Sequence, residues 1–520
     1  MEALSTATFW ILTVIVSLIP LLVWQKLNSL WLRPKRLEKL LRAQGLQGDP
    51  YKLINKKQNF MLKMPQEAKY KPFDLAKDIF SLVHQTVHKY GKNSFLWEGS
   101  RTPKVIITEP EQIKQVFNQM QDFTKPKFSS IARFFAVGLA SYEGEQWAKH
   151  RKIINPAFHI DKLKNMLPVF IQSSQDMISK WKEMLTIDGS CEIDVQPFIQ
   201  NLTCDVISRT AFGSNYVEGS KIFELLRMQG HILINTSHTR TLINWFEPAN
   251  SNKRMKEMNR EIYDLVEGII KKRETEMENG KANNDDLLGI LMESNNLEIE
   301  GHEKSKTAGM SYDELVKECK QFYIAGQETT SSLLVWTMVL LARYPEWQEL
   351  ARQEVLQVFG NQIPNHNGLN NQLKIVTMIL YEVLRLYPPT VYLVRATQKY
   401  LQLKNLSLPA GVNVSIPILL VHHDCDIWGD DAKEFKPERF SEGIAKATKG
   451  QVSFFPFGWG PRICIGQNFA LLEAKVALSL LLQNFSFELS ADYKHAPTAI
   501  LSLQPKHGVL IRLHKLLHLD

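Results

Sequence analysis

The chain has 520 residues, of which 44% are hydrophobic and 22% charged, and this ordinary balance excludes a wholly disordered or fibrous protein. Its five cysteines are scattered and form no C-x-x-C pair, which argues against a disulfide framework, a zinc ribbon and a thioredoxin-like site. The net charge of +8 is spread without a dense Lys/Arg block, so it favours an anionic membrane surface or an acidic partner over nucleic acid.

The N-terminal residues 8–24 are almost continuously apolar, which predicts a single membrane-spanning helix at the short end of the usual length. One charged residue, Glu2, precedes this segment, and basic residues come after it at Lys26, Arg33, Lys35, Arg36 and Lys39. By the positive-inside rule the N-terminus faces the lumen and the bulk of the chain stays in the cytosol. A cleaved signal peptide and an interfacial helix remain the alternatives.

Three regions are expected along the chain: residues 1–25 as lumenal tip and transmembrane anchor, 26–70 as a basic membrane-proximal linker, and 71–520 as one folded domain. The predicted fold class is mainly α with small β-sheets, because long helical patterns with few breakers dominate the last region. Helices are expected at 73–90, 109–120, within 161–273, at 311–343, at 371–387 and from 467 onward. Short strands are expected at 94–98, 104–108, 391–397 and 412–416. The polar stretch 274–310 is expected to be an exposed linker.

The helix predicted at 311–343 contains the sequence Ala-Gly-Gln-Glu-Thr-Thr at residues 325–330. Glycine and threonine are poor local choices inside a helix, and a threonine hydroxyl can bond backward to the main chain and bend it. A polar stripe on a helix packed in a large core would use the same residues. The pattern alone therefore leaves a structural and a functional interpretation open.

An E-x-x-R pair, Glu382 and Arg385, lies in the helix predicted at 371–387. The pattern alone carries little information, since ordinary residue frequencies produce roughly one or two in a chain of this length. It also occurs at Glu98, Glu224, Glu257 and Glu349. Glu382 is distinguished by its position upstream of the sequence Pro-Glu-Arg-Phe, which contains Arg439, and of a cysteine-containing segment near the C-terminus.

That segment carries the strongest signal, F-x-x-G-x-R-x-C-x-G, which spans residues 457–466 and places Cys464 in a glycine-rich bend just before an apolar helix. Glycines let a backbone approach a large flat group. A helix N-terminus and the neighbouring Arg462 would favour the thiolate, which is the metal-binding form of cysteine. A buried free cysteine is the alternative, but five fixed positions would arise by chance in about one chain per ten thousand.

This segment resembles the haem-binding loop of the cytochrome P450 superfamily of haem-thiolate monooxygenases. The resemblance implies a cytochrome P450 fold and haem b, with Cys464 as the axial thiolate ligand of the iron. It places Phe457 beside the sulfur, Gly466 where the helix start needs room, and Arg462 on a haem propionate. Weaker matches imply further propionate contacts from Trp147, Arg151 and Arg395.

The same resemblance gives the other two motifs a role. Ala325 and Gly326 would open a groove for dioxygen, and Thr329 and Glu328 would deliver protons during oxygen activation. A buried structural triad would lock the loop behind the haem, formed by Glu382, Arg385 and Arg439.

Residues 31–38 and 41–51 stand where many microsomal members have a Pro-Pro-Gly-Pro hinge, and they resemble the plant family typified by secologanin synthase, whose members oxidise terpenoids. A lipophilic substrate, a terpenoid, is thereby implied. By position, the segments expected to line its cavity are 123–141, 204–245, the start of the central helix and 390–394.

The resemblance further implies residence in the endoplasmic reticulum membrane with a cytosolic catalytic domain. Electrons would come from an NADPH-dependent flavoprotein reductase, because no G-x-G-x-x-G fingerprint for NADPH appears in the chain. Two other classes stay open at this point. One is a haem-thiolate isomerase or dehydratase, against which Thr329 argues, and the other is a non-catalytic sterol-binding membrane haem protein.

Overall fold

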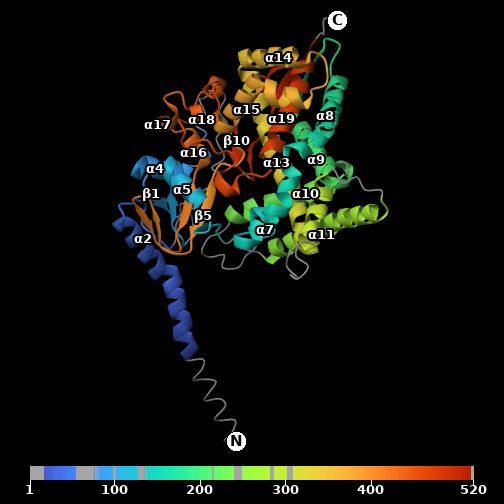
Figure 1. Ribbon diagram of the computed structural model, residues 1–520. Coiled ribbons are helices and arrows are strands. Elements are labelled where there is room, and N and C mark those ends of the chain that lie inside the picture. Colours follow the sequence, from blue (N-terminus) through green and yellow to red (C-terminus); the bar gives the residue numbers. More distant parts are fainter. Residues whose placement is uncertain are drawn as a thin grey trace.

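The computed structural model describes residues 17–53, 75, 79, 81–97, 101–126, 134, 137–213, 216–238, 249–280, 286–300, 309–499 and 501–516. Figure 1 shows a body of packed helices with small sheets, from which an N-terminal helix projects. The predicted class, mainly α with small β-sheets, is confirmed. Residues 8–16 of the predicted membrane anchor lie outside the described residues.

Helices form most of the body. The longer ones are α2 (Arg33–Ala43), α4 (Ser81–Tyr90), α5 (Pro110–Asn118), α7 (Gly144–Ile154), α8 (Ile160–Glu183), α9 (Val195–Phe212), α10 (Tyr216–His238), α11 (Ala249–Glu278), α12 (Leu287–Glu300), α13 (Tyr312–Arg343), α14 (Pro345–Phe359), α15 (Lys374–Leu386) and α19 (Gln467–Asn484). Three short helices are α16 (Ile418–His422), α17 (Cys425–Trp428) and α18 (Ile444–Ala447).

The strands form one five-stranded sheet and smaller ones. The larger sheet has the order β1-β2-β8-β5-β3, in which β2 and β8 are parallel and the other neighbours antiparallel. Its strands are β1 (Ser94–Leu96), β2 (Lys104–Ile106), β3 (Phe123–Thr124), β5 (Leu393–Thr397) and β8 (Asn413–Ile416). The others are β4 (Ser190–Asp194), β6 (Leu401–Leu403), β7 (Leu406–Leu408), β9 (Phe485–Leu489), β10 (Pro497–Ala499), β11 (Leu503–Pro505) and β12 (Leu510–Lys515).

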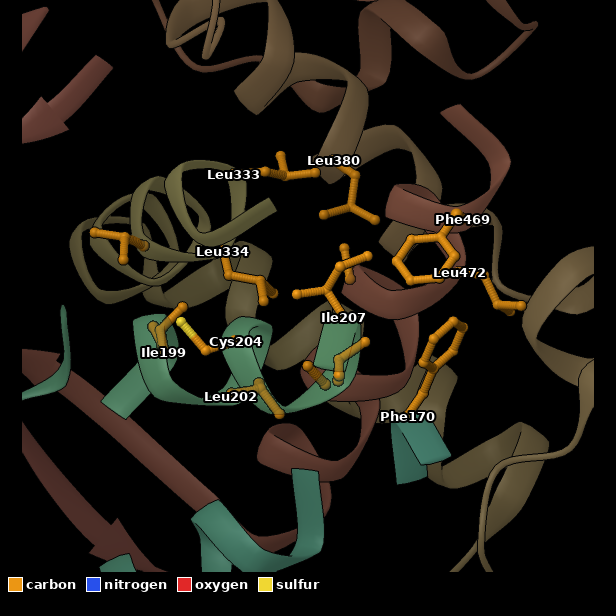
Figure 2. Close-up of a cluster of buried hydrophobic side chains, with 14 of the residues drawn as sticks. Phe170, Ile199, Leu202, Cys204, Ile207, Leu333, Leu334, Leu380, Phe469 and Leu472 are labelled. Atoms are coloured by element: carbon orange, nitrogen blue, oxygen red, sulfur yellow. The ribbon is translucent and has the colours of Figure 1, made fainter. Parts of the chain in front are cut away.

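The central helix α13 organises the helical core. It begins with a capping box, in which the Ser311 hydroxyl accepts from the Glu314 amide and the Glu314 carboxylate accepts from the Ser311 amide. It ends at Tyr344, directly before Pro345. Its apolar second half packs against α9, α15 and α19. Figure 2 shows side chains of this core, among them Phe170, Ile199, Leu202, Cys204, Ile207, Leu333, Leu334, Leu380, Phe469 and Leu472.

The N-terminal part is helical without interruption. Residues 17–27 are helical, residues 28–32 form a π-helical turn, and α2 begins directly after it. Pro34 lies in the first turn of α2 and has no N–H to donate to the carbonyl of Leu30, four residues earlier. The hydroxyl of Tyr51 donates to that carbonyl at 2.7 Å. A tyrosine from outside the helix thus binds a main-chain carbonyl of the π-helical turn.

Helix α2 is packed on the sheet. Leu37 and Leu41 are buried in one apolar cluster with Phe95 of β1. The carboxylate of Glu38 is buried beside them and accepts from the Tyr51 amide at 3.1 Å. The described part of the segment predicted as a linker is therefore attached to the folded domain.

Apolar side chains of residues 18–32 are exposed, among them Leu18, Ile19, Leu21, Leu22, Val23, Trp24, Leu27, Trp31 and Leu32. Within the described ranges, no helix combines the length and apolar character needed to cross a bilayer.

The expectation of an exposed linker at 274–310 is wrong for part of that range. Helix α12 lies inside it, and residues 287–292 are buried in the helical core. The prediction gave too much weight to the Asn-rich residues before the apolar run Leu-Leu-Gly-Ile-Leu-Met. Burial of that run lowers the free energy of the folded chain, so the run is packed in the core.

Candidate functional site

A cavity of about 290 Å³ lies between the central helix and the cysteine loop. Its lining is mainly apolar. It includes Phe117, Phe158, Ile207, Phe322, Ala325, Gly326, Thr329, Thr330, Leu333, Leu384, Pro389, Thr390, Leu393, Arg395, Ile418, Phe457, Arg462, Cys464, Gly466 and Phe469.

The cysteine loop is a tight turn. Gly458 and Gly460 have φ values of +75° and +70°, in the left-handed region that side chains rarely adopt, so glycine is required at both. The Cys464 amide donates to the Phe457 carbonyl at 2.8 Å, and α19 begins after Gly466. The loop thereby presents Cys464 to the cavity.

Three effects act on the Cys464 thiol. Burial raises its pKa, while the Gly466 amide at the start of α19 and the positive charge of Arg151 lower it. The predicted lowering of this pKa by a helix N-terminus is present, and it comes from the Gly466 amide. The nearby charge, however, is Arg151, whose Nη1 donates to the Ile463 carbonyl at 2.9 Å. Arg462 was expected in this role, but it is bound elsewhere.

Arg462 is held at the edge of the cavity by the segment before and inside α7. Its Nη1 donates to the Tyr142 carbonyl, and its Nη2 pairs with the Glu143 carboxylate, both at 2.7 Å. The guanidinium lies over the ring of Trp147, 4.4 Å from the centroid. Trp147 therefore acts on the cavity through Arg462, and it is not itself part of the lining.

Two further cations lie near the same carboxylate. Burial and the charge of Arg462 lower the pKa of Arg395, which lines the cavity. They also lower the pKa of Lys125 to about 7, and the Lys125 amide donates to Glu143 at 3.2 Å. We call Lys125, Arg395 and Arg462 the cation cluster. Lys125 and Glu143 were missed in the sequence, because no motif marks them and only the fold brings them here.

These features fit the haem that the sequence resemblance implied. A haem is flat and apolar, with a metal ion at its centre and two carboxylates on one edge. The cavity offers apolar walls, a cysteine sulfur on one side, and Arg395 and Arg462 in its lining, with Lys125 and Glu143 beside them. Two carboxylates would balance this excess positive charge, as buried charges require.

The sequence motif of the central helix meets the cavity with part of its residues. Ala325, Gly326 and Thr329 line it, and the Thr329 hydroxyl donates back to the Ala325 carbonyl at 2.7 Å. A Cβ built on Gly326 would lie 2.7 Å from Cδ1 of Ile207 in α9. The glycine therefore also permits the close packing of α9 on α13.

Glu328 is not part of the lining. Its Oε1 accepts from the Ser502 hydroxyl at 2.9 Å, on the side of α13 that faces β11. Burial raises the pKa of this carboxyl, and hydrogen bonds from Ser502 and Gln504 oppose that effect.

The three residues of the predicted triad lie together. The fully buried Glu382 and Arg385 form two hydrogen bonds of 2.7 and 2.8 Å, and Arg439 Nε lies 3.5 Å from the Glu382 carboxylate. Arg385 also donates to main-chain carbonyls of the segment before the cysteine loop. Asp431, which the motif does not include, pairs with Arg439 at 2.6 Å.

The segments expected to line the substrate cavity contribute unequally. Thr390 and Leu393 from 390–394 and Ile207 from 204–245 do line it. In the loop 123–141, Phe123 is buried in the core of the sheet region. Phe128 and Phe135 lie outside the described residues. No pattern in the sequence marks Phe117, Phe158, Leu384 and Ile418, which reach the cavity from other elements.

A scan against protein families matches residues 68–512 to the cytochrome P450 model. The chain is 66% identical to the 11-oxo-beta-amyrin 30-oxidase of Glycyrrhiza uralensis, covering 99% of this chain and 100% of that protein. It is 63% identical to the protein of the same name from Medicago truncatula, over 98% of this chain and 99% of that protein. Cytochrome P450 72A397 of Kalopanax septemlobus is 54% identical, with 95% of each chain covered.

Among solved structures, the retinoic acid-bound cyanobacterial CYP120A1 superposes with a TM-score of 0.72 at 24% identity, covering 84% of this chain and 94% of that chain. This likeness confirms the predicted fold, and the plant relatives confirm the predicted plant subfamily. The family implies haem with a cysteine thiolate ligand, a redox partner reductase and a lipophilic substrate. The chain belongs to the cytochrome P450 family of haem-thiolate monooxygenases.

Proposed function

We propose that this enzyme oxidises a triterpenoid of the β-amyrin type, with 11-oxo-β-amyrin as the first candidate substrate. The observation that carries the proposal is identity of 63–66% over nearly the whole chain to two proteins named 11-oxo-beta-amyrin 30-oxidase. The predicted isomerase and non-catalytic alternatives have no comparable support, since both relatives are named as oxidases.

The cavity suits such a substrate. Apolar side chains dominate its walls, and the hydroxyls of Thr329, Thr330 and Thr390 are among its few polar groups. A rigid hydrocarbon skeleton binds best where apolar walls exclude water and few polar groups fix its orientation. Thr390 and Leu393, which lie just before and at the start of β5, would then contact the substrate.

The positions of the residues in and around the cavity suggest a role for each of them. When bound, the haem supplies the iron that activates dioxygen, with electron density from the thiolate of Cys464. The cation cluster would hold the haem carboxylates, and Arg151 would support the thiolate charge. Thr329 holds a hydroxyl at the cavity wall, and Glu328, directly before it in the chain and bound to Ser502, would be the source of protons for the cavity.

The test is an assay of microsomes that contain this chain and a plant NADPH-dependent flavoprotein reductase. 11-oxo-β-amyrin, β-amyrin and a sterol are offered, and products are followed by mass spectrometry. We expect an NADPH-dependent oxygenated product from a triterpenoid and none from the sterol. Cys464→Ala must abolish it, while Cys425→Ala, at an exposed cysteine remote from the cavity lining, must not. Oxidation of the sterol alone would overturn the substrate proposal.

We also propose that the chain is anchored in the endoplasmic reticulum membrane by its N-terminal segment, with the catalytic domain in the cytosol. Support comes from a projecting helix (Figure 1), from the exposed apolar side chains of residues 18–32 and from the basic residues in and after this segment. Carbonate-washed microsomes should retain the full chain and release a variant that lacks residues 2–25. Release of both would contradict the anchor.

A further inference from the structure

The hairpin β10–β11 lies against the central helix where the helix carries its acid and threonine. The Leu503 carbonyl of β11 accepts from Ser332 Oγ at 2.6 Å and from Trp336 Nε1 at 2.8 Å. The Leu503 amide donates to the Pro389 carbonyl at 3.0 Å. All three hydrogen bonds fix the strand independently of Glu328, so its neighbour Ser502 is held in place before any interaction with that carboxylate.

Ser502 is buried, and its hydroxyl lies 2.9 Å from Oε1 and 3.3 Å from the carbonyl oxygen of Glu328. A hydroxyl has one proton to donate. The carboxylate receives it, because the contact is shorter and a charged acceptor binds more strongly. The Glu328 carbonyl is satisfied instead by Gln504 Nε2 at 3.2 Å.

Gln504 completes the arrangement. Its Nε2 also lies 3.0 Å from the Ser502 oxygen, so it supports the hydroxyl in the orientation that points to Glu328. Its Oε1 accepts from Gln196 at 3.4 Å, and Gln196 is half-exposed at the start of α9. The carboxylate therefore lies at the inner end of a polar row that begins near solvent, while the next residue, Thr329, lines the cavity.

We propose that Ser502 is a positioning residue for oxygen activation: its hydroxyl holds the Glu328 carboxylate between this polar row and Thr329, and proton supply to the cavity depends on that hold. The inference rests on the proposed roles of Glu328 and Thr329. It adds a residue from a C-terminal hairpin, 174 positions away in the sequence, that acts only through Glu328.

The stoichiometry of the reaction defines the quantity that the experiment measures. Productive turnover converts substrate, O₂, NADPH and one proton into hydroxylated substrate, water and NADP⁺. When the proton needed to break the O–O bond is not delivered in time, the same electrons leave as hydrogen peroxide, by O₂ + NADPH + H⁺ → H₂O₂ + NADP⁺. Product formed per NADPH consumed therefore reports on proton delivery, and haem content does not affect the ratio.

We expect Ser502→Ala to lower product per NADPH at least about threefold, with a matching rise in peroxide, because a misplaced acid loses much of its catalytic effect. The carbon monoxide spectrum of the reduced protein should stay unchanged. Ser502→Thr, which keeps the hydroxyl, should restore most of the coupling. An unchanged ratio in Ser502→Ala would overturn the inference.

Ser332→Ala is the matched control. It removes a hydrogen bond between the same helix and the same hairpin but leaves Glu328 untouched, so its product ratio should equal that of the native enzyme. A similar loss in both variants would show that only hairpin packing matters. Should Ser502→Ala fail to bind haem, Ser502→Cys keeps the volume with a weaker donor, and a native ratio there would overturn the inference.

Glu328→Gln separates this inference from the function on which it rests. If Glu328→Gln leaves the ratio unchanged, the proposed role of Glu328 is wrong, and the inference falls with it. If Glu328→Gln lowers the ratio and Ser502→Ala does not, only the inference is wrong. With both correct, the double variant should be no worse than Glu328→Gln alone, since Ser502 acts through that carboxylate.

Discussion

The triad and the cation cluster are both largely enclosed by protein, yet their charges are balanced differently. With Asp431, the triad holds two arginines against two carboxylates, Lys436 and Glu434 add one further charge of each sign beside Asp431, and the protein itself satisfies Arg385 and Glu382. The cation cluster holds three cations, and Glu143 is the carboxylate described beside them. A balanced cluster stabilises the fold, whereas an unbalanced one requires a ligand of opposite charge. Substitutions in the two clusters should therefore have different consequences.

The largest effect is expected from Glu382→Gln. It leaves the fully buried Arg385 without a counter-charge, which costs about 3–5 kcal/mol of folding free energy. We expect little folded haem protein, measured by the carbon monoxide spectrum and by soluble yield. Glu349→Gln is the matched control, because Glu349 forms the same E-x-x-R pair with Arg352 but is 54% exposed. Equal loss in both variants would contradict the distinction.

Arg462→Gln should weaken haem retention while the protein still folds. A hydrogen bond to a charged group contributes about 1.5–3 kcal/mol, which corresponds to about 10–100-fold in affinity. The measurement is the rate of haem transfer to an excess of apomyoglobin. Lys152→Gln, which alters an exposed cation of α7 beside Arg151, should leave the rate unchanged. A native rate in Arg462→Gln would remove this arginine from the haem site.

Lys125 makes haem binding depend on pH. Burial and Arg462 hold its pKa at about 7 in the protein without ligand, well below the usual value for lysine. A haem carboxylate nearby favours the charged form and raises that pKa, so binding takes up a proton above pH 7. Haem affinity should therefore be constant below pH 7 and decrease as the pH rises from about 7 to about 9. Lys125→Met should flatten this dependence, and an unchanged profile would exclude Lys125 from the haem site.

The smallest effect is expected from Asp431→Asn at the outer edge of the triad. Asp431 is 33% exposed, and exposed ion pairs contribute about 0–1 kcal/mol. A slightly lower unfolding temperature with unchanged haem transfer is the expected result. A loss as large as that of Glu382→Gln would show that the triad needs a fourth buried member.

The cysteine loop and the central helix could be predicted because each depends on local sequence, whereas the triad followed only from the family resemblance, since Arg439 reaches Glu382 from another element. A turn with two left-handed glycines and a helix with a capping box are each determined by residues that are close together in the sequence. Lys125, Glu143 and Ser502 could not be predicted in this way. Each reaches its partner from another element, and only the folded chain makes Ser502 a neighbour of Glu328.

The helix that runs from residue 17 into α2 has a geometric consequence for the proposed anchored enzyme. Residues 17–43 are helical throughout, and the Tyr51 hydroxyl binds the Leu30 carbonyl in the π-helical turn, so the exposed apolar residues are joined to the sheet region by continuous helix. In a continuous α-helix, each added residue rotates the rest of the chain by about 100° and advances it by about 1.5 Å. The orientation of the catalytic domain relative to the bilayer then depends on the number of residues in this helix. One alanine inserted after Trp24 should therefore turn a different face of the catalytic domain toward the lipid. Crosslinking by a reagent attached to the lipid should detect this change.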